Sequence, residues 1–343
     1  MVQFSSFFNH NMHSRAIIQA VILCGGKGTR LSTLYSDRPK IMVPIANRPF
    51  LEWQLEWLGR QDITDIHLAA GYKAEVLREW LAQQKKSEVS PASERCSGFS
   101  KELSANVQQP TSNNQRRRRS WPFVGRWTLD VDRWALNDSE TRSQKSEVRG
   151  GVVASGPSPV INQQLSVPVS SLIPIQISGF KFQVSSSTEP LPLGTGGGLK
   201  FIIPWLRSDP FLVINGDSLV PNLDFNDLEQ VHRRSGRPIT ITVTRIEGTG
   251  RYGTVEFDHS GCITAFREKA DRTEGWVNAG IYVVSNQVLR EIPDGKPVSI
   301  ETDTFPTLVQ QGLLNAYQCR PPLLDMGTPE GIRAMESHLT PST

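Results

Sequence analysis

The chain has 343 residues, of which 38% are hydrophobic and 21% are charged, and its formal net charge is +3. This length permits one large domain or two ordinary ones, with a substantial buried core. The longest apolar run, Ala16 to Cys24, contains Gln19 and is well short of the roughly 18–20 residues of a membrane-spanning helix, which excludes that kind of anchor.

The cysteines and the first apolar run indicate the cellular compartment of the protein. Leu23 is too large for a typical signal-peptide processing site, so we expect no secretion. The four cysteines lack CxxC spacing, which argues against a zinc cluster or a disulfide framework: Cys24, Cys96, Cys262 and Cys319. We therefore expect a cytoplasmic protein.

The first 82 residues predict a tail followed by alternating strands and helices. Residues 1–15 have no clear period and should form a loose tail. An apolar strand from Ala16 to Leu23 follows, with a Gly-rich turn and a helix around Pro49 to Leu58. A strand from Asp65 to Ala70 and a helix near Ala74 to Ala82 complete the pattern, which is typical of a parallel α/β sheet with right-handed crossovers.

Residues 83–176 are expected to be a largely disordered insertion, because they are rich in polar residues and show little periodicity. They hold 13 Lys/Arg against 8 Asp/Glu, a surplus of five that leaves −2 on the rest of the chain. A solvated basic loop is the favoured reading of Arg116-Arg117-Arg118-Arg119, rather than a contact with nucleic acid. One short ordered element within this segment stays an alternative, because tryptophan is unusual in disordered chains and three occur close together: Trp121, Trp127 and Trp134.

Regular elements return after this segment, and neither half of the chain has enough strands for a core alone. We expect residues 16–82 and 177–338 to form one domain. The predicted elements are a strand at Phe180 to Val184, a Gly-rich turn, a helix at Gly198 to Leu206, a strand at Phe211 to Asn215, a helix at Asn226 to Arg234, strands at Ile239 to Thr244, Thr254 to Phe257, Ile263 to Phe266 and Val277 to Val284, a helix near Thr304 to Gln311 and a strand near Ala316 to Cys319.

A glycine turn directly follows the first strand: Gly25-Gly26-Lys27-Gly28-Thr29-Arg30-Leu31. Such a junction presents backbone N–H groups to an anion without side chains in the way. It is neither a Walker A loop nor a dinucleotide fingerprint, because Gly28 stands where Ser or Thr is required and Leu31 where a third glycine would fall. Arg30 and Lys40 flank the turn and suit a triphosphate, with surface charges beside a tight turn as the alternative.

These residues resemble the sugar-1-phosphate nucleotidyltransferases, also called sugar-nucleotide pyrophosphorylases, whose N-terminal pattern is L-x-G-G-x-G-T-R-L, then P-K and V-P-[IV]. Cys24 replaces a usual Ala and Ile41 a common Pro, and neither departure touches a charged group. The matching residues are Leu23 to Leu31, Pro39-Lys40 and Val43-Pro44-Ile45.

Later motifs fall in the order of the same family and look most like its heptose-1-phosphate and mannose-1-phosphate guanylyltransferases. They are Glu189-Pro190-Leu191-Pro192-Leu193-Gly194-Thr195-Gly196-Gly197-Gly198, Asn215-Gly216-Asp217, Arg251-Tyr252-Gly253-Thr254, Glu268-Lys269, Asn278-Ala279-Gly280 and Leu324-Asp325-Met326-Gly327-Thr328-Pro329.

The resemblance implies the transfer of a nucleoside monophosphate from an NTP to a sugar 1-phosphate, with release of pyrophosphate. An oxygen of the sugar phosphate attacks the α-phosphorus, a step that calls for metal and cations rather than a covalent nucleophile. The resemblance also implies that Asp217 and Asp325 bind Mg²⁺ and that Arg30, Lys40 and Lys269 are catalytic. Taken alone, an Asp after a strand is more often a turn former.

The resemblance also divides the substrate contacts. Sugar contacts are implied for Tyr252, Gly253, Glu268, Asn278 and Gly280, although turn glycines and an exposed charge pair would look the same. Nucleotide contacts are implied for Gly25, Gly26, Gly28, Thr29, Glu189, Gly194, Thr195 and Gly196, with backbone amides of the second glycine turn approaching the base. An ionised Glu189 accepts hydrogen bonds and suits the N1–H and N2–H₂ edge of guanine, so GTP is favoured.

The implied fold is one α/β nucleotide-binding domain of the glycosyltransferase-A type, with a mixed, mostly parallel sheet and helices on both faces. Its partners would be an NTP and a sugar 1-phosphate, with no membrane, no nucleic acid and a homo-oligomer left open. Three alternatives stay open: a catalytically silent sugar-nucleotide sensor, a uridylyl- or thymidylyltransferase, and an interaction protein that works through residues 83–176.

Overall fold

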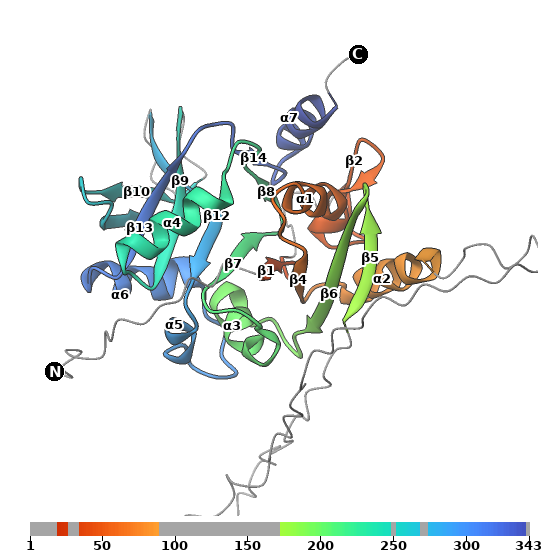
Figure 1. The fold of residues 1–343 in the computed structure, drawn as a ribbon, viewed down its shortest axis with the longest axis horizontal. Helices are drawn as coiled ribbons and strands as arrows, with labels where there is room; N and C mark the ends of the chain where they lie inside the picture. Colours follow the sequence, from red (N-terminus) through yellow and green to blue (C-terminus); the bar gives the residue numbers. More distant parts are fainter. Residues whose placement is uncertain (1–18, 27–33, 89–171, 248–251, 268–273, 341–343) are drawn as a thin grey trace, which may run out of the picture. The chain divides into compact units, whose positions relative to one another are not determined.

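The fold is built on a mixed sheet in which ten strands are joined (Figure 1). The computed structural model describes residues 19–26, 34–88, 172–247, 252–267 and 274–340. Four parallel strands form the centre of the sheet, in the order β6 (Phe180–Thr188), β4 (Asp65–Ala70), β1 (Gln19–Leu23) and β7 (Phe211–Asn215). Since these strands run the same way, their carboxyl ends lie along one edge, which we call the carboxyl edge.

Other strands extend the sheet on both sides of this centre. β5 (Ile173–Ile177) pairs antiparallel with β6, and β12 (Glu274–Val284) pairs antiparallel with β7. Beyond β12, the strands are β9 (Ile239–Glu247), β13 (Leu314–Cys319), β10 (Thr254–Phe257) and β11 (Ile263–Arg267). Two short antiparallel pairs lie outside the main sheet: β2 (Pro44–Ile45) with β3 (Arg48–Pro49), and β8 (Ser218–Leu219) with β14 (Leu324–Asp325).

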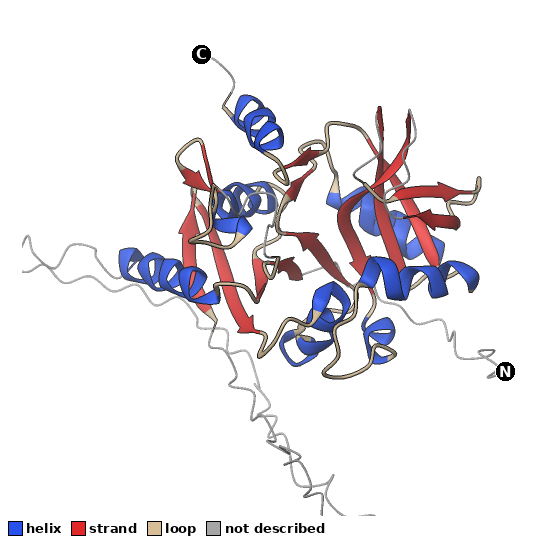
Figure 2. Cartoon of the chain, turned by 180° about the vertical axis from the view of Figure 1, so that it is seen from behind, coloured by secondary structure: helices blue, strands red, loops and turns tan. Residues whose placement is uncertain are grey.

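Helices cover both faces of the sheet, as the resemblance implied (Figure 2). One buried cluster contains residues of α1 (Phe50–Gly59), α2 (Ala74–Glu88), α4 (Phe225–Ser235) and α7 (Pro329–Leu339). The other contains residues of α3 (Gly194–Phe201), α5 (Asn286–Arg290) and α6 (Phe305–Gln310). Single turns occur at η1 (Lys40–Met42), η2 (Ile203–Trp205) and the π-helical η3 (Ile300–Thr304). None of the helices in the described ranges combines the length and apolarity needed to cross a membrane.

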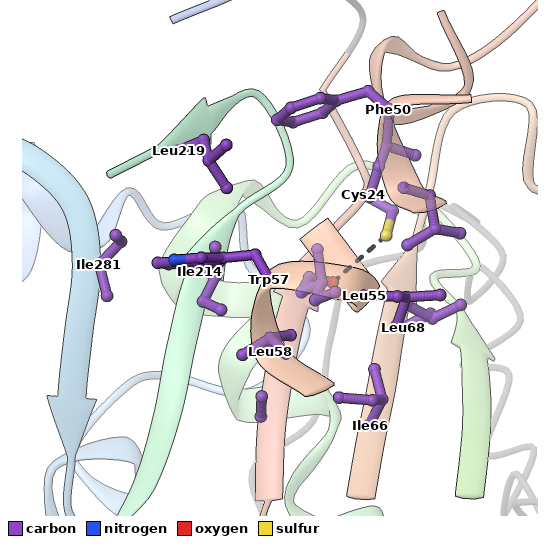
Figure 3. Close-up of a cluster of buried hydrophobic side chains, with 14 of the residues drawn as sticks. Cys24, Phe50, Leu55, Trp57, Leu58, Ile66, Leu68, Ile214, Leu219 and Ile281 are labelled. Carbon is purple, nitrogen blue, oxygen red and sulfur yellow. Dashed lines mark hydrogen bonds between the residues drawn. The ribbon is translucent and has the colours of Figure 1, made fainter. Parts of the chain in front are cut away.

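The alternation of side chains along β1 explains the two clusters. Ala20 and Ile22 enter the cluster with α1, whereas Val21 enters the cluster with α3. Successive strand residues point to opposite faces, so a strand covered on both sides is apolar throughout. Figure 3 shows the first cluster, where Leu55 and Leu58 of α1 pack over Ile66 and other strand residues.

Two predicted boundaries of the insertion are wrong. Helix α2 continues to Glu88 instead of ending near Ala82, and β5 (Ile173–Ile177) lies inside the range 83–176. β5 alternates buried and exposed residues and joins β6 through Ser178 and Gly179, which both have positive φ, as a two-residue hairpin turn requires. Residues 89–171 and the tail 1–15 lie outside the described residues.

The predicted start of one helix is also wrong. Gly194 to Gly198 were expected to form a turn before a helix from Gly198 to Leu206, but α3 begins at Gly194 and ends at Phe201. Glycine disfavours helix, so the sequence pattern hid this element. Contacts with a distant segment of the chain hold it, as described below.

A histidine is fully buried in the centre of the sheet. His67 of β4 has Nδ1 2.9 Å from Ser185 Oγ and Nε2 3.0 Å from Ser187 Oγ, both on β6. Burial, with a smaller contribution from Arg207, lowers its pKa from 6.5 to about 3. The fold therefore holds this imidazole neutral.

This histidine should make the protein less stable in acid. Its pKa in the folded chain is below the unfolded value, so the unfolded chain takes up a proton that the folded chain refuses, and stability falls as the pH drops through about 6.5 toward 3. From pH 8 to pH 5 the expected loss from His67 is about 2 kcal/mol. Urea unfolding at both pH values checks this: His67→Gln should reduce the difference, and His259→Gln, in an exposed turn, should not. An unchanged difference in His67→Gln would refute the assignment.

Candidate active site

The ends of the four parallel strands are tied together along the carboxyl edge. Cys24 N donates to Ala69 O at 2.8 Å, and Gly216 N donates to Leu23 O at 3.1 Å. Glu189 N donates to Ala70 O at 2.9 Å. These bonds hold the first residues after β1, β7 and β6, which are Cys24, Gly216 and Glu189. Gly25, Gly26, Gly71 and Asp217 lie at the same edge, because they also follow the ends of these parallel strands. In open α/β sheets, ligands bind at such an edge.

Asp217 and Asp325 are brought together by the short β8–β14 pair. Asp325 lies opposite Ser218 in this pair, and Met326 N donates to Asp217 O at 3.0 Å. Lys40 Nζ lies 2.6 Å from Asp217 Oδ2, so one of the predicted cations contacts the carboxylate of Asp217. Lys40 and Asp217 are both part-exposed, so this ion pair is accessible from the solvent.

The start of helix α7 holds Asp325 in place. Gly327 N donates to Asp325 Oδ1 at 2.7 Å, and Thr328 caps the helix by accepting from Gly331 N at 3.1 Å. A Cβ on Gly331 would lie 1.9 Å from the carbonyl oxygen of Asp325. The Thr-Pro-x-Gly sequence therefore starts the helix with a cap and a proline, and its glycine lets the helix pack directly on the backbone of Asp325.

Two neighbouring carboxylates are a donor set that fits Mg²⁺. This ion is usually bound through one or two carboxylates together with waters and substrate phosphates, rather than by an all-protein cage. Within the described ranges there is no group of three or more His, Cys, Asp or Glu that could hold a metal.

Glu189 sits among glycines that leave room for its carboxylate. A Cβ on Gly198 of α3 would lie 2.5 Å from Glu189 Oε1, one on Gly25 3.8 Å from Oε1, and one on Gly71 3.5 Å from Oε2. Leu193 N donates to Oε2 at 3.1 Å. Burial raises the pKa of Glu189 above its usual value, and the Leu193 amide opposes that shift. The carboxylate is thus fixed between β1, β4 and α3.

Two amides of the second glycine motif bond within the protein, so the expectation that the amides of this motif approach a base is corrected for Gly196 and Gly197. Gly196 N and Gly197 N both donate to Val298 O, at 2.8 and 3.2 Å. A Cβ on Gly194 would lie 2.5 Å from the same oxygen. Thr195 Oγ1 donates to Glu301 Oε2 at 2.7 Å and accepts from Ile300 N at 2.9 Å. Gly194, Thr195 and Gly196 therefore attach α3 to residues 298–301.

Of the residues predicted to contact the sugar, those that the structure describes lie where β10 begins beside β12. Asn278 N donates to Gly253 O at 2.8 Å, which places Tyr252 next to Asn278. Gly280 has φ 72°, and a Cβ there would lie 2.7 Å from Asn215 Nδ2 at the end of β7. This glycine lets β12 pass close to the strand that leads to Asp217. The predicted residues Gly28, Thr29, Arg30, Glu268 and Lys269 lie outside the described residues.

Sequence reasoning missed several residues of this region. Gln54 of α1 is fully buried and donates to Asn215 O and Ser218 O, both at 3.0 Å, so it holds both ends of the turn that carries Asp217. A polar residue on an otherwise apolar helix face was the available signal. Glu301 and Tyr282 gave no local signal, because their partners are far away in the sequence.

The fold and this edge define a nucleotide-binding α/β protein with paired carboxylates, a lysine beside them and a fixed glutamate. The chain belongs to the nucleotidyl transferase family, whose model matches residues 19–103 and 154–341. Residues 104–153 fall outside the match, a narrower range than the predicted insertion.

Individual relatives agree with this family. A mannose-1-phosphate guanylyltransferase of Mycobacterium tuberculosis is 36% identical over 316 residues, which cover 91% of this chain and 62% of the relative. The mannose-1-phosphate guanylyltransferase catalytic subunit beta of Drosophila pseudoobscura is 28% identical over 315 residues, which cover 91% of this chain and 60% of the relative. This chain thus spans about three fifths of the length of these relatives.

Solved structures share the fold. HddC from Yersinia pseudotuberculosis, a structure of which contains GMP-PN, has a TM-score of 0.60 at 21% identity, covering 94% of this chain and all of that one. A putative glucose-1-phosphate thymidylyltransferase from Bacillus anthracis has a TM-score of 0.58 at 13% identity, covering 95% of this chain and 96% of that one. Both likenesses support the α/β class with helices on both faces.

Proposed function

We propose that the protein transfers GMP from GTP to a sugar 1-phosphate of the mannose or heptose type, giving a GDP-sugar and pyrophosphate. The observation that carries this proposal is the β8–β14 pair, which brings the backbones of Asp217 and Asp325 together, with Lys40 Nζ 2.6 Å from Asp217 Oδ2. The names of the relatives favour mannose 1-phosphate and guanylyl transfer.

The chemistry asks the site to bring two anions together. The sugar phosphate oxygen forms a bond to the α-phosphorus while the bond to pyrophosphate breaks, and negative charge grows on the leaving group. A Mg²⁺ ion held by Asp217 and Asp325 would neutralise phosphate charge and keep the reacting oxygens in line. Lys40 adds positive charge at the same place, because its ammonium contacts the carboxylate of Asp217. Arg30 and Lys269 are further proposed cations.

Glu189 is the residue proposed to select the base. Its Oε2 accepts a hydrogen bond from the Leu193 amide, and its Oε1 lies beside Gly25 and Gly198, which have no side chain. An ionised carboxylate accepts hydrogen bonds only, so it favours the donor edge of guanine over the acceptor edge of cytosine.

The decisive experiment is a pyrophosphate-release screen of four NTPs against a panel of sugar 1-phosphates with Mg²⁺. GTP with mannose 1-phosphate or a heptose 1-phosphate should give the highest kcat/KM. Preference for UTP or dTTP would instead favour the uridylyl- or thymidylyltransferase alternative. Binding of a sugar nucleotide without turnover of any pair would favour the sensor alternative.

Glu189→Gln should lower the ratio of kcat/KM for GTP over CTP about tenfold or more, because an amide loses a charge-assisted acceptor that guanine uses. The ratio is measured with each nucleotide under the same sugar 1-phosphate. Glu229→Gln on α4, a part-buried glutamate paired with Arg233, is the matched control and should leave the ratio unchanged. Equal ratios in the wild type and Glu189→Gln would contradict base reading by this residue.

A further inference from the structure

A single carboxylate joins two parts of the site region that are far apart in the sequence. Glu301, in η3, accepts at Oε2 from Thr195 Oγ1 at 2.7 Å and from Ser299 Oγ at 3.0 Å. At Oε1 it accepts from the hydroxyl of Tyr282 at 3.3 Å. Thr195 belongs to α3 and Tyr282 to β12, so Glu301 bonds to both elements.

The Tyr282 hydroxyl also forms a hydrogen bond with Asn278, so Glu301 is linked to Asn278 through Tyr282. Asn278 Nδ2 donates to Tyr282 Oη at 2.8 Å, and Asn278 Oδ1 accepts from Gly280 N at 2.9 Å. Tyr282 is fully buried, and burial, together with the Glu301 charge, raises its pKa well above the usual value. The phenol is therefore protonated at neutral pH, and it donates to Glu301 and accepts from Asn278 Nδ2.

The two ends of this network lie at different parts of the proposed substrate site. Through Thr195, Glu301 fixes α3, whose Gly198 packs on the carboxylate of Glu189. Through Tyr282, it fixes Asn278, which is joined to Gly253 at the start of β10. Hydroxyl donors satisfy a part-buried carboxylate, and hydrogen bonds to a charged group are among the stronger ones.

We propose that Glu301 is a positioning residue that sets α3 for the nucleotide through Thr195 and sets Asn278 for the sugar through Tyr282. We call the Glu301–Thr195 contact the Thr195 branch and the Glu301–Tyr282–Asn278 contacts the Tyr282 branch. This inference rests on the proposed function, because it assigns one branch to each of the two proposed substrates. Glu301 touches neither substrate in this proposal and acts through its partners.

Each branch can be interrupted by a substitution that removes one hydroxyl group. Tyr282→Phe removes the hydroxyl between Glu301 and Asn278 and leaves the Thr195 branch intact. Thr195→Val removes the hydroxyl at α3 and leaves the Tyr282 branch intact, whereas Thr195→Ser keeps it. Glu301→Ala removes both branches. Glu301→Gln keeps one carbonyl oxygen for Thr195 but cannot accept at both ends.

The chain offers a matched control for the tyrosine variant. Tyr317 of β13 is also a buried tyrosine in the same sheet, and its hydroxyl donates to Asp227 Oδ2 at 2.9 Å, on α4. Tyr317→Phe therefore removes the same kind of tyrosine–carboxylate hydrogen bond away from Asn278 and α3.

The experiment measures Kd by calorimetry for GTP and for mannose 1-phosphate in the full chain, together with KM for both. Tyr282→Phe should raise the mannose 1-phosphate values about fivefold and leave those for GTP within twofold. Thr195→Val should raise the GTP values about fivefold and leave those for mannose 1-phosphate within twofold. Thr195→Ser should keep GTP binding close to that of the wild type. Glu301→Ala should raise both sets, with Glu301→Gln closer to the wild type for GTP. Tyr317→Phe should change neither.

The outcomes separate this proposal from the proposed function. If Tyr282→Phe matches Tyr317→Phe, or weakens both substrates equally, Glu301 has no separate branches and the proposal is overturned. If the wild type binds both substrates without turnover, the transferase function fails while the Kd values still decide the proposal. If the wild type binds neither substrate, both are overturned.

Discussion

Asp217→Asn and Asp325→Asn are each expected to lower turnover roughly a thousandfold, which is about 4 kcal/mol of transition-state stabilisation. Each change removes a charged oxygen ligand and keeps the size of the side chain. The fold should survive, because the β8–β14 pair and the Met326 N to Asp217 O bond use backbone atoms only.

The measurement is pyrophosphate release at saturating GTP and mannose 1-phosphate over a Mg²⁺ titration, with Mn²⁺ binding followed separately by electron paramagnetic resonance. Asp258→Asn is the control, since Asp258 forms a capped turn between β10 and β11. Near-normal turnover of both aspartate variants at high Mg²⁺ would remove the two carboxylates from the proposed metal site.

Gly194→Ala is expected to destabilise the protein by about 2–4 kcal/mol, for two reasons. Its φ is +71°, which is strained for any residue with a Cβ and costs about 1 kcal/mol. The added Cβ would also lie 2.5 Å from the carbonyl oxygen of Val298, and a clash with backbone adds about 1–3 kcal/mol.

Gly236→Ala separates these two contributions. Gly236 ends α4 with φ +63°, and a Cβ there would meet nothing within 4 Å, so only the strain should remain. Guanidinium unfolding of both variants gives the comparison. Similar losses of unfolding free energy in the two variants would mean that the clash with Val298 does not contribute to the effect of Gly194→Ala.

The main strands and the paired aspartates could be predicted because their signals are local or lie in motifs. The strand Asp65 to Ala70 was predicted with the bounds that the structure has. The family resemblance paired Asp217 with Asp325, and β8 and β14 bring them together. These strands have two residues each, too few for any period to be visible.

What could not be predicted depends on contacts between distant segments. Four glycines at Gly194 and Gly196 to Gly198 disfavour a helix, yet α3 forms because its amides bond to Val298, about a hundred residues away. Glu301 likewise has partners at Thr195 and Tyr282. No local pattern contains such pairings.

The strand order also constrains how the chain folds during synthesis. β1 lies between β4 and β7, and Phe211 of β7 follows Leu23 of β1 by about 190 residues, which a ribosome takes roughly 10–40 s to add. During that interval the edge of β1 that will pair with β7 has no partner from its own sheet. An open, apolar strand edge can pair with other chains. The nascent protein is therefore most exposed to aggregation before residue 215 has emerged, and chaperone protection would matter most in that window.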